Sequence, residues 1–189
     1  MGGLGWPSQG LLWALAFAGL YVFVFQVNRF FDPIFLVIEA KVSLVFLPAF
    51  IRVAAVLVAG TAGALGLFLG AFVLGSIQEL PLGSSLGQAF FTASAPCLAL
   101  LLIRYALAGR PLEIRLSLFL MLALFASLFN SLLHHLFWDF YPFAGPVTLT
   151  TFWQMLVGDL LGVLMGFGAF AFVVRLLKTA TPENPDKAA

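Results

Sequence analysis

Long runs of apolar residues, separated by short polar segments, make up most of this chain. A helix needs about 20 mostly apolar residues to cross the hydrocarbon core of a bilayer. The runs predict six membrane-spanning helices, at about residues 7–28, 42–59, 62–77, 84–107, 116–137 and 151–177. The second and third are short, and Gly60-Thr61-Ala62-Gly63 between them favours a tight hairpin. We therefore expect an all-α polytopic transmembrane bundle formed by residues 1–178.

The remaining segments are too short or too polar to cross a bilayer. Residues 29–41 predict an interfacial or re-entrant piece, and residues 179–189 lack apolar periodicity and predict a disordered cytoplasmic tail. Pro48 and Pro96 fall inside spans and predict kinks or breaks. Small residues repeat at a spacing of four and predict close helix packing; they are Ala55, Ala59 and Gly63, then Gly66 and Gly70, then Gly162 and Gly166.

The composition excludes a soluble protein. Hydrophobic residues make up 62% of the chain and charged residues 9%, against about 45–50% and about 25% in soluble domains. The net charge is +1, and no basic run is long enough to follow a phosphate backbone, so we expect no nucleic acid partner. Cys97 is the single cysteine, which excludes a disulfide framework.

The basic residues of the short loops predict the orientation in the membrane. They gather at two places, Arg104, Arg110 and Arg115 between the fourth and fifth spans, and Arg175 and Lys178 after the sixth. Six spans put both places on one side, which the positive-inside rule assigns to the cytoplasm. Both termini are then cytoplasmic, in a multi-pass protein of a bacterial inner membrane. Arg29 and Lys41 are the exceptions, because this arrangement places them outside.

Three polar residues lie within the predicted spans at one level. At 1.5 Å per residue, Arg52 lies about 15 Å, Asn130 about 10 Å and Asp159 about 12 Å from the outer face. Because an isolated charge at such a depth is costly, we expect Arg52 and Asp159 to face each other. The pair is either a structural contact that fixes helix register or the floor of a pocket for a small ligand or ion. A third possibility is that one charge reaches an interface.

A polar stripe marks the fifth span. Ser127, Asn130, Ser131 and His134 share one helical face, where they form interhelical hydrogen bonds or a wall of the same pocket. His134 and His135 point about 100° apart and do not easily share an ion, so we expect no metal site. No nucleophile elbow, zinc-protease motif or phosphate loop is present, so we expect a non-enzymatic protein without a cofactor that the sequence identifies.

Two motifs about a hundred residues apart carry a family resemblance. They are Leu47-Pro48-Ala49-Phe50-Ile51-Arg52-Val53, followed by Gly66-Leu67-Phe68-Leu69-Gly70, and Trp153 followed by Gly158-Asp159-Leu160-Leu161-Gly162. In this order they resemble the integral membrane sensor domains of the MASE-one type, which precede histidine kinases and diguanylate cyclases. The resemblance covers about residues 42–177 and assigns Pro48, Arg52, Gly158, Asp159 and Gly162 to the site. Family domains often have eight spans and a proline shortly after the second motif, whereas this chain has Met165-Gly166-Phe167-Gly168 there.

No kinase or cyclase segment follows the last span, so the resemblance implies a sensor that acts through a partner. The leading hypothesis is a membrane sensor or binding module that contacts the lipid bilayer and another membrane or signalling protein. Its ligand-binding or coupling pocket would comprise Arg52, Asp159, Asn130, His134, Pro48, Gly158 and Gly162. The alternatives are an accessory structural subunit of a membrane complex and the substrate-binding subunit of a vitamin-type transporter.

Overall fold

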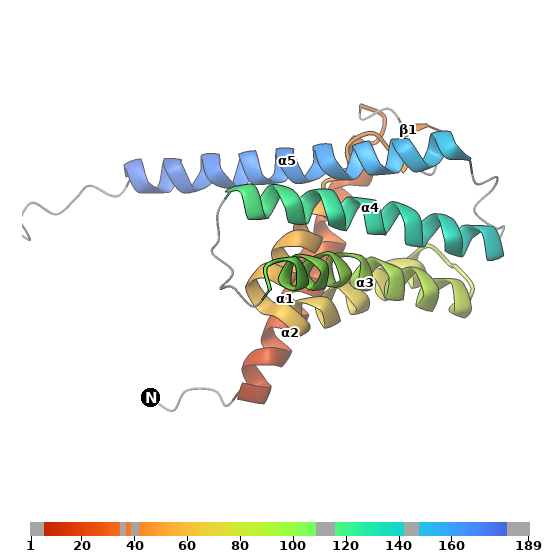
Figure 1. Ribbon diagram of the computed structural model, residues 1–189, viewed down its shortest axis with the longest axis horizontal. Coiled ribbons are helices and arrows are strands. Elements are labelled where there is room, and N and C mark those ends of the chain that lie inside the picture. Colours follow the sequence, from red (N-terminus) through yellow and green to blue (C-terminus); the bar gives the residue numbers. More distant parts are fainter. Residues whose placement is uncertain (1–5, 35–36, 39–41, 109–115, 142–147, 181–189) are drawn as a thin grey trace, which may run out of the picture.

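The computed structural model describes residues 6–34, 37–38, 42–108, 116–141 and 148–180. Within these residues the fold is a bundle of long helices with one short strand pair at its edge (Figure 1). The elements are α1 Trp6–Phe31, β1 Val37–Ile38, β2 Val42–Ser43, α2 Pro48–Ile77, α3 Leu82–Ala106, α4 Leu116–Phe140 and α5 Leu149–Ala180. The strands are antiparallel, with Val37 opposite Ser43 and Ile38 opposite Val42.

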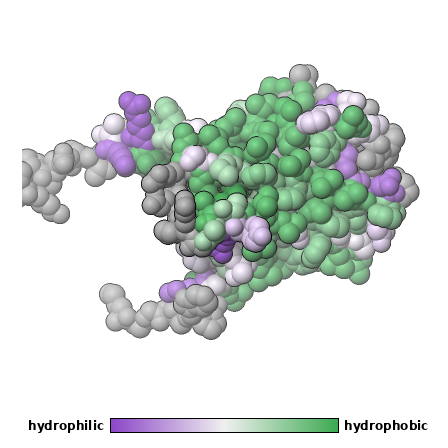
Figure 2. Space-filling view, in the orientation of Figure 1, coloured by the Kyte–Doolittle hydropathy of each residue, from purple (hydrophilic) through white to green (hydrophobic). Residues whose placement is uncertain are grey.

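The surface of the bundle is suited to lipid. Five described helices are long and apolar enough to cross a membrane. Large apolar side chains stand exposed on several of them, among them Phe23, Val58, Leu101 and Phe172. Figure 2 shows apolar residues covering the middle of one face, with hydrophilic residues toward its two ends. The predicted all-helical membrane bundle is therefore confirmed at the level of fold class.

The chain reverses direction inside α2. Gly60 has φ 54° and ψ −123°, a conformation open to glycine but not helical. A Cβ placed on Gly63 would overlap the carbonyl oxygen of Ala55. Residues eight positions apart on one straight helix lie about 12 Å apart, so this contact requires the two parts of α2 to fold back on each other. The hairpin predicted at Gly60–Gly63 is present.

Contacts between the helices give their directions. The second part of α2 runs parallel to α1, because Gly66 meets Ala14 and Gly70 meets Ala18. It runs antiparallel to α3, where Gly75 packs against Ser85. The antiparallel arrangement of α4 and α5 follows from contacts that join Asn130 to Asp159 and His135 to Thr151. Gly87 and Phe91 of α3 contact Phe137 and His134 of α4, so these two helices are antiparallel as well. Successive segments thus alternate in direction, and the start of α1 lies at the same end of the bundle as the end of α5.

The segment before α2 corrects the predicted second span. Helix was expected from Val42, but β2 covers Val42–Ser43 and the helix begins at Pro48. Pro48 therefore starts a helix instead of kinking one, since the first turn requires no proline N–H. Pro96 was expected to kink or break its span, yet α3 continues through it without a non-helical residue. Apolar runs do not distinguish buried extended chain from helix, which explains the first error.

Both ends of the predicted span pattern also differ from the structure. The α1 helix continues through Arg29 to Phe31, so the predicted interfacial piece begins later than residue 29. The α5 helix continues to Ala180, two residues into the predicted tail, and residues 181–189 lie outside the described part of the chain. Arg110, Arg115 and Lys41 also fall outside it. Helix ends are the part of a pattern that hydropathy locates least well.

Three glycines of α5 form the surface against which the start of α2 and the segment before it pack. A Cβ on Gly158 would overlap the carbonyl oxygen of Ser43, and one on Gly162 would overlap that of Phe46. Gly166 packs in the same way against the side chain of Phe50. The backbone amide of Phe46 also donates a hydrogen bond of 2.9 Å to the carbonyl of Gly158. Small residues on α5 therefore let a non-helical backbone approach a helix directly.

This close approach predicts opposite effects for two alanine substitutions in α5. Gly162→Ala should lower the free energy of unfolding by about 1–3 kcal/mol, because the methyl group collides with backbone. The matched control is Gly168→Ala, whose Cβ meets nothing within 4 Å and which should leave stability unchanged or higher. Thermal unfolding in detergent measures both. Equal effects of the two substitutions would contradict the described packing.

Candidate functional site

A buried ion pair lies at the centre of the bundle. Arg52 on α2 donates from Nη2 to Oδ1 of Asp159 on α5 at 2.5 Å. The exposed fractions of the two residues are 4% and 1%, so neither charge reaches the surface. The sequence prediction that these two residues face each other is confirmed. Two opposite charges that are removed from water together cost far less than either charge alone.

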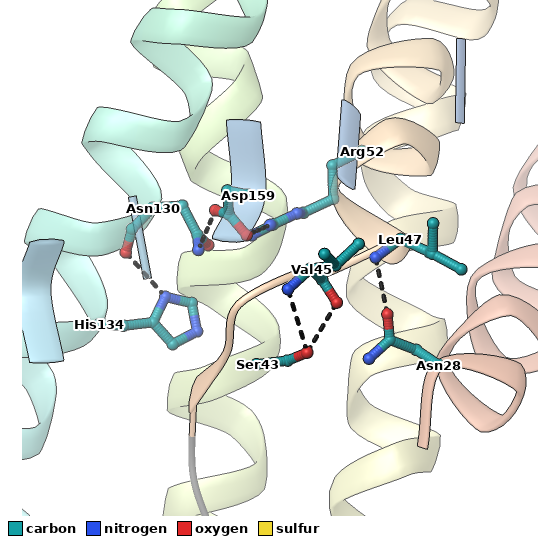
Figure 3. A network of polar contacts seen from close by, with 8 residues as sticks. All are labelled: Asn28, Ser43, Val45, Leu47, Arg52, Asn130, His134 and Asp159. Carbon is teal, nitrogen blue, oxygen red and sulfur yellow. Dashed lines mark hydrogen bonds and ion pairs between the residues drawn. The ribbon is translucent and has the colours of Figure 1, made fainter. Parts of the chain in front are cut away.

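Asn130 on α4 extends the pair to a third helix. Its Nδ2 donates to the other carboxylate oxygen of Asp159 at 2.9 Å, so Asp159 accepts bonds from two helices (Figure 3). One turn further along α4, His134 Nδ1 donates to the backbone carbonyl of Asn130 at 3.1 Å. The predicted polar stripe does face the interior, since Ser127, Asn130, Ser131 and His134 are all buried.

The position of Arg52 depends on how α2 is anchored at its start. The backbone amide of Leu47 donates to Oδ1 of Asn28 on α1 at 2.8 Å, which satisfies an amide just ahead of the helix (Figure 3). The same Asn28 donates from Nδ2 to Asp32 at 3.0 Å. On the opposite side, α5 holds Phe46 through the carbonyl of Gly158. Arg52 therefore projects from a helix start that two other helices fix.

A cavity of about 380 Å³ leads from one end of the bundle to this ion pair. Its inner part is lined by Tyr21, Arg52, Thr92, Asn130, His134 and Asp159. Its mouth lies at the end where α1 finishes and includes Arg29, Asp32, Gln78, Gln88 and Trp138. Arg29 and Gln78 are exposed, so the cavity is continuous with the outside of the molecule. This volume lies within the range of small-molecule sites.

The surroundings of Asp32 at the mouth of the cavity affect the pKa of its carboxyl group. Partial burial raises the pKa of its carboxyl group above the usual value. Asn28, Ser43 and Arg29 act in the opposite direction, because each favours the ionised form. Among the described residues, Arg29 and Asp32 thus bring one cationic and one acidic side chain to the mouth of the cavity.

The residues assigned to the site from sequence divide into two groups. Arg52, Asp159, Asn130 and His134 line the cavity together. Pro48, Gly158 and Gly162 are not among its lining residues, and they instead shape the backbone that carries Arg52 and Asp159. Their contribution is therefore to position the polar residues.

Sequence reasoning missed several lining residues. Tyr21 and Asn28 on α1 and Thr92 on α3 are polar residues inside or at the end of apolar runs, which was the available signal. Trp138, which follows the predicted end of the fifth span, also lines the cavity. Hydropathy alone does not reveal which side of a helix end faces inward.

His135 lies beside the site and links α4 to the start of α5. Its Nδ1 donates to the carbonyl of Ser131 at 2.8 Å, and its Nε2 lies 3.1 Å from the hydroxyl of Thr151 on α5. Thr148 and Thr151 exchange hydrogen bonds between side chain and backbone and so cap the start of α5. Among the described residues, no group of three or more His, Cys, Asp or Glu side chains has an arrangement that could hold a metal ion.

Searches against protein-family models, curated proteins and solved structures found no match for this chain.

The ion pair predicts a non-additive response to mutation. Arg52→Ala and Asp159→Ala should each lower the free energy of unfolding by about 3–5 kcal/mol, because each leaves a buried charge without its partner. The double substitution should cost less than the sum of the two by about 1–3 kcal/mol. Thermal or denaturant unfolding of the four proteins in detergent gives the coupling energy. Strictly additive losses would mean that the two side chains do not interact.

Proposed function

We propose that this protein is a non-enzymatic membrane sensor or binding module that takes up a small ligand in its cavity and acts through a partner protein. The cavity is the observation that carries the proposal. A buried polar floor reached from one end of an otherwise apolar bundle is the arrangement expected for ligand capture within a membrane. Helix packing alone would not require an opening of about 380 Å³ above the ion pair.

The site also offers a route from ligand to partner. Asp159 belongs to α5, which is the longest helix and extends beyond the other helices at the end opposite the mouth (Figure 1). Most side chains of α5 beyond Val163 are exposed in this chain. A ligand that alters the contacts of Asp159 would shift α5 between two packings, provided that it binds them unequally. The exposed part of α5 is then the element that a partner protein would contact.

The sequence resemblance to MASE-one sensor domains agrees with this proposal. Its two motifs meet in space, because Arg52 bonds Asp159 while Gly158 and Gly162 contact the segment that leads to Pro48. A motif pair that forms one contact site is more informative than two separate matches. We propose membership of that sensor type on this basis.

We propose six membrane crossings with both termini in the cytoplasm. The second crossing would consist of the non-helical residues 42–47 and the first part of α2, and the third of the part after Gly60. The twelve helical residues before Gly60 rise about 18 Å, and the non-helical residues continue the crossing along α5 toward the mouth. Non-helical backbone is tolerated at that depth where protein covers it, as α5 does here. The cavity would then open to the outside.

The substrate-binding subunit of a transporter is the second candidate. The same cavity favours it, because capture from the outer face is the first step of uptake. The two functions differ in the partner: a signalling protein in one case and an energising transporter assembly in the other. The accessory-subunit alternative gains no support from the cavity, since a structural subunit requires no binding site.

Labelling of single cysteines tests the six crossings. In a Cys97→Ala background, a membrane-impermeant maleimide applied to intact cells should label Asp139→Cys and should not label Ser8→Cys, Tyr105→Cys or Lys178→Cys. The last three should react once the cells are permeabilised, because they lie at the cytoplasmic end. If α2 crosses only once, Ser8→Cys and Tyr105→Cys will lie on opposite sides, which would contradict the proposal.

Purification from native membranes in mild detergent tests the function itself. We expect a stoichiometric companion with a kinase, cyclase or other signalling domain, and we expect substitutions on the exposed part of α5 to release it. Phe172→Glu is such a substitution, and Phe23→Glu on α1 is the matched control, since both side chains are more than half exposed. A companion composed of transporter ATPase and scaffold subunits would favour the second candidate. Isolation without any companion would count against both.

A further inference from the structure

One face of α4 presents a ladder of polar side chains to the cavity. Asn130, His134 and Trp138 lie at successive turns of this helix, and all three line the cavity. Four residues of helix rise about 6 Å, so the ladder spans about 12 Å from the ion pair to the mouth. Each rung carries a polar atom whose hydrogen bonds determine what the cavity can accept.

The rungs have free hydrogen-bonding capacity. Within the described part of the chain, Asn130 Oδ1 and Trp138 Nε1 are buried atoms that have no hydrogen-bond partner. Asn130 uses its Nδ2 on Asp159, so its free atom is an acceptor. His134 uses Nδ1–H on a backbone carbonyl, which leaves Nε2 as an acceptor in the neutral ring. Two acceptors thus lie near the floor and one donor lies near the mouth.

Among the described residues that line the cavity, the charges are balanced. Arg52 and Asp159 neutralise each other at the floor, and Arg29 and Asp32 have opposite charges at the mouth. An ionic ligand at the floor would find no unpaired counter-charge and would lose its hydration. The floor therefore favours an uncharged ligand, in contrast to a site in which a single arginine or carboxylate faces the ligand.

The remaining walls combine aromatic and apolar side chains with polar ones, which are Asn28, Ser43, Gln78, Gln88 and Thr92. Tyr21, Phe25 and Phe46 line the cavity together with Leu74 and Met155. Phe46 is already beneath the guanidinium of Arg52, 5.2 Å from its ring centroid. Aromatic side chains in these walls can bury the faces of a planar ligand ring, because stacked and edge-to-face contacts between aromatic rings are favourable.

We infer that the cavity binds an uncharged, planar aromatic molecule with a hydrogen-bond donor at one end and an acceptor at the other. The donor end contacts Asn130 Oδ1 and His134 Nε2 near the ion pair. The acceptor end receives the indole N–H of Trp138. This inference rests on the proposed function as a binding module and specifies the ligand class of that same site.

Three probe molecules of similar shape test whether the cavity requires an uncharged ligand with a hydrogen-bond donor. They are 4-methoxybenzamide, 4-methoxybenzoate and 4-methoxybenzamidine, which are neutral, anionic and cationic at pH 7 and share the methoxy acceptor. In thermal unfolding of the full chain in detergent, the amide should raise the midpoint in proportion to its concentration. The two ions should leave the midpoint unchanged. Isothermal titration gives the dissociation constant for the amide.

Paired variants test the two ends of the ladder. Trp138→Phe keeps a ring and removes the donor, and it should weaken amide binding by about fivefold. Trp153→Phe is the control on α5, because Trp153 is exposed and absent from the cavity lining, and it should bind as the natural chain does. His134→Phe keeps the aromatic contacts with Phe91 and Trp138 and should weaken binding by a similar factor.

The result that overturns the inference is equal or tighter binding of either ion, or no binding of the amide up to its solubility limit. The second result would mean that the free polar atoms are satisfied by ordered water alone. Unchanged affinity in both Trp138→Phe and His134→Phe also overturns it. Each of these results is separate from the proposed function, which fails if native purification yields no companion.

Discussion

The carboxylate of Asp159 must be compensated inside a bundle that is almost entirely apolar, and this requirement organises the structure around it. Arg52 provides the opposite charge and Asn130 a further donor, so three helices converge on one side chain. Removing any of these partners would leave a buried polar group without its hydrogen-bond or ionic partner. The packing of α2, α4 and α5 is therefore fixed by a polar contact as well as by small residues and apolar side chains.

The unusual path of the chain before α2 serves the same contact. A non-helical segment packs against the glycines of α5, bonds Asn28 of α1, and places Arg52 one turn into a new helix. Gly60 then turns the chain back toward the mouth. Ser43 and Phe46 of this segment line the cavity together with Arg52 and Asp159. The path that brings the arginine to its partner therefore also forms part of the cavity wall.

Most of the helices and the central contact could be predicted from the sequence, because membrane burial makes hydropathy and isolated charges unusually informative. Arg52 and Asp159 could be paired because neither tolerates lipid alone. The non-helical residues before Pro48 could not be predicted, since a short apolar run is compatible with helical and with non-helical backbone. The roles of Trp138 and Asn28 also escaped, because they depend on which way a helix end faces. The cavity arises from packing among the five described helices, and no local pattern encodes it.

The central claim is that Arg52 and Asp159 bond each other within the membrane. Solid-state NMR of the full chain in lipid bilayers, with ¹⁵N-labelled arginine and ¹³C-labelled aspartate, measures the distance between the guanidinium nitrogens of Arg52 and the carboxyl carbon of Asp159. Assignment by Arg52→Lys isolates the signal. We expect a separation below about 4 Å, as a direct ionic hydrogen bond requires. A separation beyond about 7 Å would contradict the account, since no direct bond spans that distance.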